Sequence, residues 1–110
     1  MRAASLAAAV AVLALTGCGG SGGSKAPPQH HIHLTAFETR GKAIFIADCG
    51  MCHQLADAGT SGTAGPALAG SWAAPLVRET IANGIGGMPA NLVTGRKAAA
   101  VAAYVAAATR

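Results

Sequence analysis

The feature that most constrains this chain is the run C-x-x-C-H at residues 49–53. On one helical turn, Cys49 and Cys52 lie on the same face, and the imidazole of His53 follows directly. Two thiols and one imidazole in this arrangement can hold a porphyrin through two thioether bonds and ligate its iron once. The pattern therefore predicts covalent attachment of one haem c through Cys49 and Cys52.

Two other uses of a C-x-x-C pair stay open, a redox-active dithiol and half of a zinc site. A thioredoxin-like dithiol lies in a βαβ unit, and no strand-like run flanks residues 49–53. A zinc site takes four protein ligands, and Cys18, the only cysteine outside the motif, has a different predicted use. Haem attachment is therefore the favoured interpretation.

The composition indicates that side chains alone make a small core. The chain has 110 residues, alanine dominates, and only two Phe, one Trp and one Tyr are aromatic. So short a domain buries little apolar area, and a haem would supply the missing core. The formal net charge is +4, and no Lys/Arg cluster is interleaved with aromatic residues, so nucleic acid is not an expected partner.

Residues 1–17 are typical of an export signal that is cleaved from the mature chain. Arg2 forms a short positive segment, and the apolar run at residues 3–15 is shorter than the roughly 17 to 25 residues of a membrane-spanning helix. Residues 15–18, Leu-Thr-Gly-Cys, resemble a bacterial lipobox, after which cleavage leaves a lipidated Cys18. The alternative is an ordinary signal peptide with an incidental cysteine. We expect an exported lipoprotein, anchored on the outer face of the cytoplasmic membrane or in the periplasm or cell envelope.

Residues 18–33 are predicted to be a flexible tether, because Gly, Ser and Pro are frequent and no apolar period is present. A tether of this length has an r.m.s. reach of about 20 Å. His30, His31 and His33 at its end can bind a transition metal or reach a haem iron. With no acidic or cysteine companions nearby, solvated linker histidines are the favoured interpretation.

The folded domain is predicted to span residues 34–110 and to begin with a helix. Thr35 and Glu38 have the spacing of a capping box, and a stripe of small and apolar positions follows them. Gly41 lies within this stripe, where glycine costs about 0.8 to 1 kcal/mol relative to alanine. Its presence suggests close approach by another helix.

Two further helices are predicted. Ser71 is the expected N-cap of a helix at residues 72–82. Residues 96–110 form the last helix, whose narrow apolar stripe fits a close crossing with the first one. Tyr104 of this helix is expected to pack on Phe45.

Residues 54–72 are expected to be irregular and to wrap the cofactor, because glycines break every period. The carbonyl of Pro66 can accept the Nδ1 hydrogen of His53 and so orient the ring, and a plain turn proline is the alternative. Trp72 can offer its indole N–H to a haem propionate, or it is simple core.

Met88 lies in a loop rich in Gly and Pro at residues 84–90. Met1 belongs to the cleaved segment and Met51 to the attachment motif, so Met88 is the thioether free to reach the haem face opposite His53. An isolated Met is more often core filler, but a bound haem reverses that preference. Sulfur opposite imidazole favours Fe(II) and raises the potential, which suits an electron carrier.

Several of these features follow one another in a recognisable order along residues 38–110. They are Gly41 and Phe45, Cys49-x-x-Cys52-His53, Gly65-Pro66-x-Leu68, Gly87-Met88-Pro89 and an aromatic-bearing terminal helix. In this order they resemble a small class I cytochrome c. The resemblance implies an all-α fold in which three to four short helices wrap around one haem and the N- and C-terminal helices cross. It also implies His53 and Met88 as axial ligands, and one-electron transfer as the role.

Three functions remain consistent with the sequence. The first is a membrane-tethered monohaem electron carrier, expected to be a monomer, that serves redox protein partners. The second is a haem c subunit of a larger oxidoreductase or respiratory complex. The third is a ligand-sensing haem protein in which Met88 does not hold the iron. Catalysis by the chain alone is not expected, because its carboxylates are scattered rather than paired: Glu38, Asp48, Asp57 and Glu79.

Overall fold

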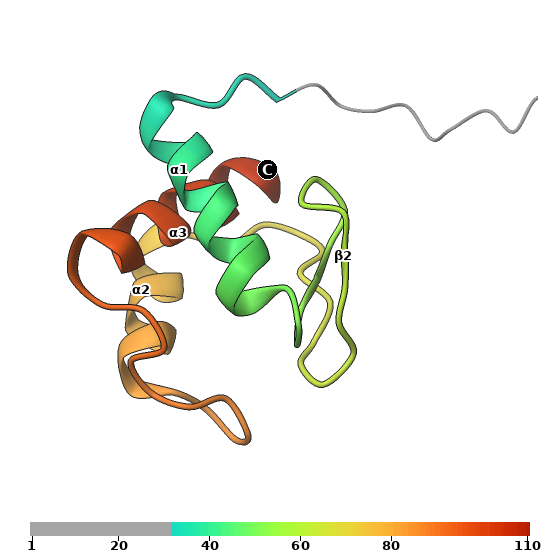
Figure 1. Cartoon of the computed structure of the whole chain (residues 1–110), viewed down its shortest axis with the longest axis vertical. Coiled ribbons are helices and arrows are strands. Elements are labelled where there is room, and N and C mark those ends of the chain that lie inside the picture. Colours follow the sequence, from blue (N-terminus) through green and yellow to red (C-terminus); the bar gives the residue numbers. More distant parts are fainter. Residues whose placement is uncertain (1–31) are drawn as a thin grey trace, which may run out of the picture.

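The computed structural model describes residues 32–110, which form three α-helices, one π-helical turn and one short hairpin (Figure 1). The elements in chain order are α1 (Ala36–Ile44), η1 (Phe45–Cys49), β1 (Gln54–Leu55), β2 (Thr60–Ser61), α2 (Ala74–Asn83) and α3 (Gly95–Ala108). The predictions for the export signal, Cys18, the tether, His30 and His31 lie outside the described residues. Within residues 32–110, every helix is too short or too polar to cross a membrane.

Helix α1 begins at the predicted capping box. Glu38 Oε2 accepts the backbone N–H of Thr35 at 2.7 Å, and the Thr35 hydroxyl accepts the backbone N–H of Glu38 at 3.2 Å. These hydrogen bonds satisfy N–H groups that a helix start leaves without partners. The carboxylate of Glu38 accepts from the Thr35 backbone N–H and, at 2.9 Å, from the Thr35 hydroxyl, and these two bonds lower the pKa of Glu38 because they stabilise its ionised form.

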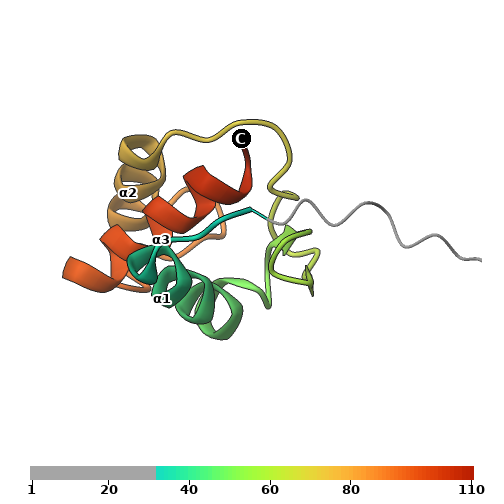
Figure 2. The ribbon, with the colours of Figure 1, turned by 90° about the horizontal axis from the view of Figure 1, so that it is seen from above.

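Helices α1 and α3 cross at Gly41, as predicted. A Cβ atom added at Gly41 would collide with the carbonyl group of Ala100 and lie 2.9 Å from Cβ of Tyr104, so only glycine fits. Beside the crossing, the rings of Phe45 and Tyr104 meet edge to face with centroids 5.9 Å apart, which confirms their predicted contact. Figure 2 shows α3 between α1 and α2, and α3 contributes most of the fully buried side chains.

The stretch at residues 54–72 is not wholly irregular, and the fold is therefore not purely α-helical. Strands β1 and β2 pair antiparallel, with Gln54 opposite Ser61 and Leu55 opposite Thr60. Each strand has two residues, too few for an alternating pattern to be visible in the sequence. The buried side chain of Leu55 anchors this hairpin to the core.

Helix α2 starts at Ala74, two residues later than predicted, and Ser71 is not its cap. The N-cap is Ala73, which makes no side-chain capping bond, and Pro75 lies in the first turn. Trp72 lies outside the helix, and its backbone N–H donates to the Thr109 hydroxyl at 3.2 Å. Because the helix begins without a side-chain cap, its start leaves no capping signal in the sequence.

Candidate haem-binding site

The two thiols of the C-x-x-C-H motif lie where η1 ends. Cys49 is the last residue of η1, and its carbonyl accepts the backbone N–H groups of Cys52 and His53 at 3.1 and 2.9 Å. This turn places both free thiols and the imidazole on one short segment. Cys49 is buried and Cys52 is exposed. Burial raises the pKa of the Cys49 thiol to about 11, with smaller contributions from Asp48 and Cys52.

The ring of His53 is oriented by the carbonyl of Pro66. Nδ1 lies 2.9 Å from the Pro66 oxygen, which is the hydrogen bond predicted from the sequence. A carbonyl oxygen can only accept, so Nδ1 carries a hydrogen, and in this tautomer the lone pair of the imidazole is on Nε2. The second nitrogen is thereby available to ligate a metal.

Gly65 packs directly against the same ring. A Cβ atom at Gly65 would lie 2.7 Å from Cε1 and 2.9 Å from Nδ1 of His53, so a side chain here would displace the imidazole. The backbone N–H of Gly65 also donates to the Cys52 carbonyl at 2.7 Å. From the sequence, Gly65 was recognised only as part of the Gly65-Pro66-x-Leu68 motif. Its steric role depends on the path of the folded loop.

The β1–β2 hairpin connects His53 to the helices. The Thr60 hydroxyl donates to the His53 carbonyl at 2.9 Å and accepts the Leu55 N–H at 3.0 Å. Between the strands, Asp57 Oδ2 accepts the hydroxyl of Tyr104 at 2.6 Å and lies 3.1 Å from Nζ of Lys42. The hairpin is thus bonded to both crossed helices.

The role of Asp57 in joining the hairpin to the helices was not predicted from the sequence, where it counts only as one of four scattered carboxylates. Its partner Tyr104 is fully buried. Burial, and then the hydrogen bond and negative charge of Asp57, raise the pKa of Tyr104 far above its usual range. The two residues are 47 positions apart, so no local pattern could have paired them.

Met88 lies on a separate loop, between α2 and α3. Its N–H donates to the Ile85 carbonyl at 2.9 Å and its carbonyl accepts the Ile85 N–H at 3.2 Å, which closes a tight turn. The side chain is half-buried and packs against the hydrophobic core, whereas Ile85 is 72% exposed. Figure 1 shows this orange loop below α2 and the green attachment turn at the lower end of α1. The role of Met88 as second ligand stays a prediction.

Trp72 is half-buried at the edge of the core. Its indole N–H donates to the Ala69 carbonyl at 3.0 Å. The predicted donation to a haem propionate therefore has a competitor, because this N–H already has a protein partner.

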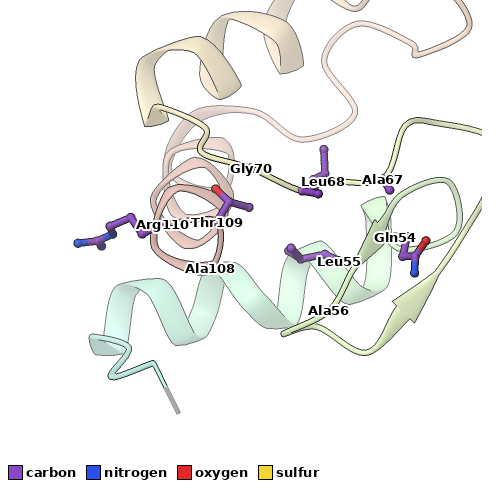
Figure 3. Close-up of a pocket in the computed structure, with 10 residues that line it drawn as sticks. Gln54, Leu55, Ala56, Ala67, Leu68, Gly70, Ala108, Thr109 and Arg110 are labelled. Atoms are coloured by element: carbon purple, nitrogen blue, oxygen red, sulfur yellow. The ribbon is translucent and has the colours of Figure 1, made fainter. Parts of the chain in front are cut away.

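A cavity of about 320 Å³ lies between β1, the loop before α2 and the end of α3 (Figure 3). Cys49, Cys52, His53 and Met88 do not line it. The cavity is lined by Gln54, Leu55, Ala56, Ala67, Leu68, Ala69, Gly70, Ala108, Thr109 and Arg110. In the described part of the chain, no three His, Cys, Asp or Glu side chains gather as a metal site, and His33 is exposed.

The crossed helices, the C-x-x-C-H turn and the oriented histidine together define a c-type cytochrome domain. The sequence profile of the family described as cytochrome c oxidase, cbb3-type, subunit III matches residues 36–105. The chain belongs to this family of cytochrome c domains.

Among solved structures, the chain is similar to the c-type cytochrome SorU from Sinorhizobium meliloti. The two share 37% sequence identity and superpose with a TM-score of 0.57, over 66% of this chain and 93% of SorU. A comparison with curated proteins found no match. Membership of the family implies covalently bound haem c and haem-based electron transfer.

Proposed function

We propose that this protein is a membrane-tethered monohaem cytochrome c that passes single electrons between redox proteins outside the cytoplasmic membrane. The observation that carries the proposal is the bond between His53 Nδ1 and the Pro66 carbonyl, which leaves Nε2 free beside two free thiols. A dithiol enzyme would have no need of an imidazole fixed in this tautomer. A haem protein requires it.

The residues present fit a covalently attached haem. Cys49 and Cys52 would form the two thioether bonds, and His53 Nε2 and the Met88 sulfur would ligate the iron. When bound, the haem supplies an iron that takes up and releases one electron. Gly65 leaves the room that the imidazole occupies, and Pro66 holds its hydrogen at Nδ1. A thioether as the second ligand beside an imidazole would favour the reduced iron and so raise its potential.

The attachment is tested by producing the protein together with a haem-attachment system and measuring its intact mass under denaturing conditions. The mass should exceed that of the polypeptide by one haem. A Cys49→Ala/Cys52→Ala variant should lose the added mass. Covalent haem in that variant, or none in the wild type, would refute the assignment.

The tether and its location are proposed from residues 1–33, whose lipobox-like residues 15–18 precede a Gly/Ser-rich segment. The mature protein would begin at a lipidated Cys18 in the cell envelope. Mass spectrometry of the protein purified from membranes decides this point. A first residue other than Cys18, or a Cys18 without acyl chains, contradicts the anchor but leaves the electron-transfer role intact.

A second function is supported by the description of the matching family, which names an oxidase subunit. In that case the same domain relays electrons inside a larger complex. Purification in mild detergent separates the two functions, because a complex subunit should co-elute with a larger redox protein and a carrier should elute alone. The ligand-sensing alternative would require Met88 to leave the iron open.

A further inference from the structure

Three basic side chains gather on one face of the domain, where the first turns of α1 lie beside the start of α3. Arg40, Arg96 and Lys97 line a shallow hollow of about 150 Å³ and all three are exposed. The guanidinium of Arg96 lies over the ring of Phe37, 5.9 Å from its centroid, and this ring is itself 36% exposed. We call these four residues the basic face.

The charge of the basic face is not neutralised within residues 32–110. The ion pairs of this part of the chain join Lys42 to Asp57 and Arg110 to Glu38. Neither pair involves a cation of the basic face. Three positive charges and an exposed aromatic ring therefore remain available to an external surface.

The basic face lies at the end of the domain opposite the haem attachment. Arg40 is nine residues before Cys49 on nearly continuous helix, so the two are separated by about 13 Å along the axis at a rise of 1.5 Å per residue. Residues 32–35, through which the proposed tether joins the domain, enter at the same end as Phe37. Figure 1 shows this entry at the upper end of α1 and the attachment turn at its lower end.

We propose that the basic face rests on the anionic lipid head groups of the membrane that holds the tether. Lys and Arg near such a surface are attracted to it, and their aliphatic stems, like an aromatic ring, suit the head-group region. A redox protein docked at this face would lie at the end of α1 away from the haem-attachment turn, which makes it the poorer occupant. Lipid docking leaves the attachment end free for redox partners. The inference rests on the proposed tether.

The test uses the full mature chain, residues 18–110, loaded with haem and carrying Cys18→Ser, so that no acyl chain contributes. Its partition is measured on vesicles of phosphatidylcholine alone and of phosphatidylcholine mixed with phosphatidylglycerol, at low salt. Binding should be stronger on the mixed vesicles and should weaken at physiological salt, where the Debye length is about 8 Å. The triple variant Arg40→Gln/Arg96→Gln/Lys97→Gln should lower the partition about a hundredfold, or about fivefold for each charge removed.

Two control variants make the result specific. Arg78→Gln removes one exposed cation of α2, outside the basic face, and should have little effect. Arg40→Lys/Arg96→Lys keeps the charges and should bind like the parent. Equal partition on both kinds of vesicle, or a loss in Arg78→Gln as large as the roughly fivefold loss expected for each cation of the basic face, would overturn the inference, even if the anchor at Cys18 is confirmed by mass spectrometry.

Discussion

At the scale of single residues, the imidazole of His53 is held by two adjacent neighbours with different roles. Pro66 fixes the tautomer through its carbonyl, and Gly65 fixes the position of the ring by having no side chain. The first role is chemical, because it decides which nitrogen is free. The second is steric, because any Cβ atom at Gly65 would overlap the imidazole.

Gly65→Ala should therefore move the imidazole and disturb iron ligation. We expect a loss of about 1 to 3 kcal/mol in the free energy of unfolding, as for other overpacked sites, together with a shift in reduction potential. Denaturant unfolding and potentiometric titration measure the two effects. Gly87→Ala is the control, because a Cβ atom at Gly87 meets nothing within 4 Å. Equal behaviour of the two variants would show that Gly65 does not position the ring.

Tyr104→Phe should remove the hydrogen bond that fastens the hairpin to α3. A hydrogen bond to a charged group contributes about 1.5 to 3 kcal/mol, so a loss of this size in the free energy of unfolding is expected. A double-mutant cycle with Asp57→Asn should show that the two losses are not additive. Additive losses would mean that the Tyr104 hydroxyl and Asp57 act independently.

The raised pKa of Tyr104 also predicts a pH dependence of stability. The folded state holds this phenol neutral, so its contribution is complete below the unfolded pKa of about 10 and is lost as pH rises above it. The free energy of unfolding should fall above this pH in the parent, and should fall less steeply in Tyr104→Phe. Identical alkaline slopes for the two proteins would contradict this account.

At the scale of elements, the crossing of α1 and α3 depends on one position. Gly41→Ala should gain about 0.8 to 1 kcal/mol from helix propensity and lose more from the collision with the Ala100 carbonyl. Because the obstacle is backbone, the collision should dominate, with a net loss of about 1 to 3 kcal/mol in denaturant unfolding. Ala43→Gly, at an exposed position of α1, isolates the propensity effect. A stabilised Gly41→Ala variant would mean that the helices can separate.

The predictions from the sequence were confirmed where the signal lay in a short stretch of chain, or where few residues could fill the predicted role. The capping box, the close approach at Gly41 and the bond between His53 and Pro66 all belong to this class. The crossing partners Phe45 and Tyr104 were found because few aromatic residues compete for the core.

The failures have physical causes. Strands of two residues leave no period, so the β1–β2 hairpin was invisible. Helix α2 begins after Ala73, which makes no side-chain capping bond, so its start has no capping signal in the sequence, and Asp57 is linked to Tyr104 only by the tertiary fold. The π-helical turn η1, closed by the bond from the Gly50 N–H to the Phe45 carbonyl at 2.8 Å, has no sequence signature of its own.

At the scale of the whole molecule, α1 joins the haem-attachment turn at one end to the start of the described chain at the other. The lower end of α1 leads through η1 to Cys49, and its upper end receives the chain from residue 32 beside the basic face. In the proposed function, one end meets redox partners and the other meets the membrane. The domain would then be oriented as well as tethered.

Ligation of the iron by His53 and Met88 can be read from the absorption spectrum of the oxidised and reduced haem-loaded protein, compared with that of Met88→Ala. We predict a low-spin haem c with the weak far-red sulfur-to-iron band. Met88→Ala should keep the covalent haem but lose this band and have a lower reduction potential. The same band and potential in Met88→Ala, or a high-spin spectrum in the parent, would contradict ligation by His53 and Met88.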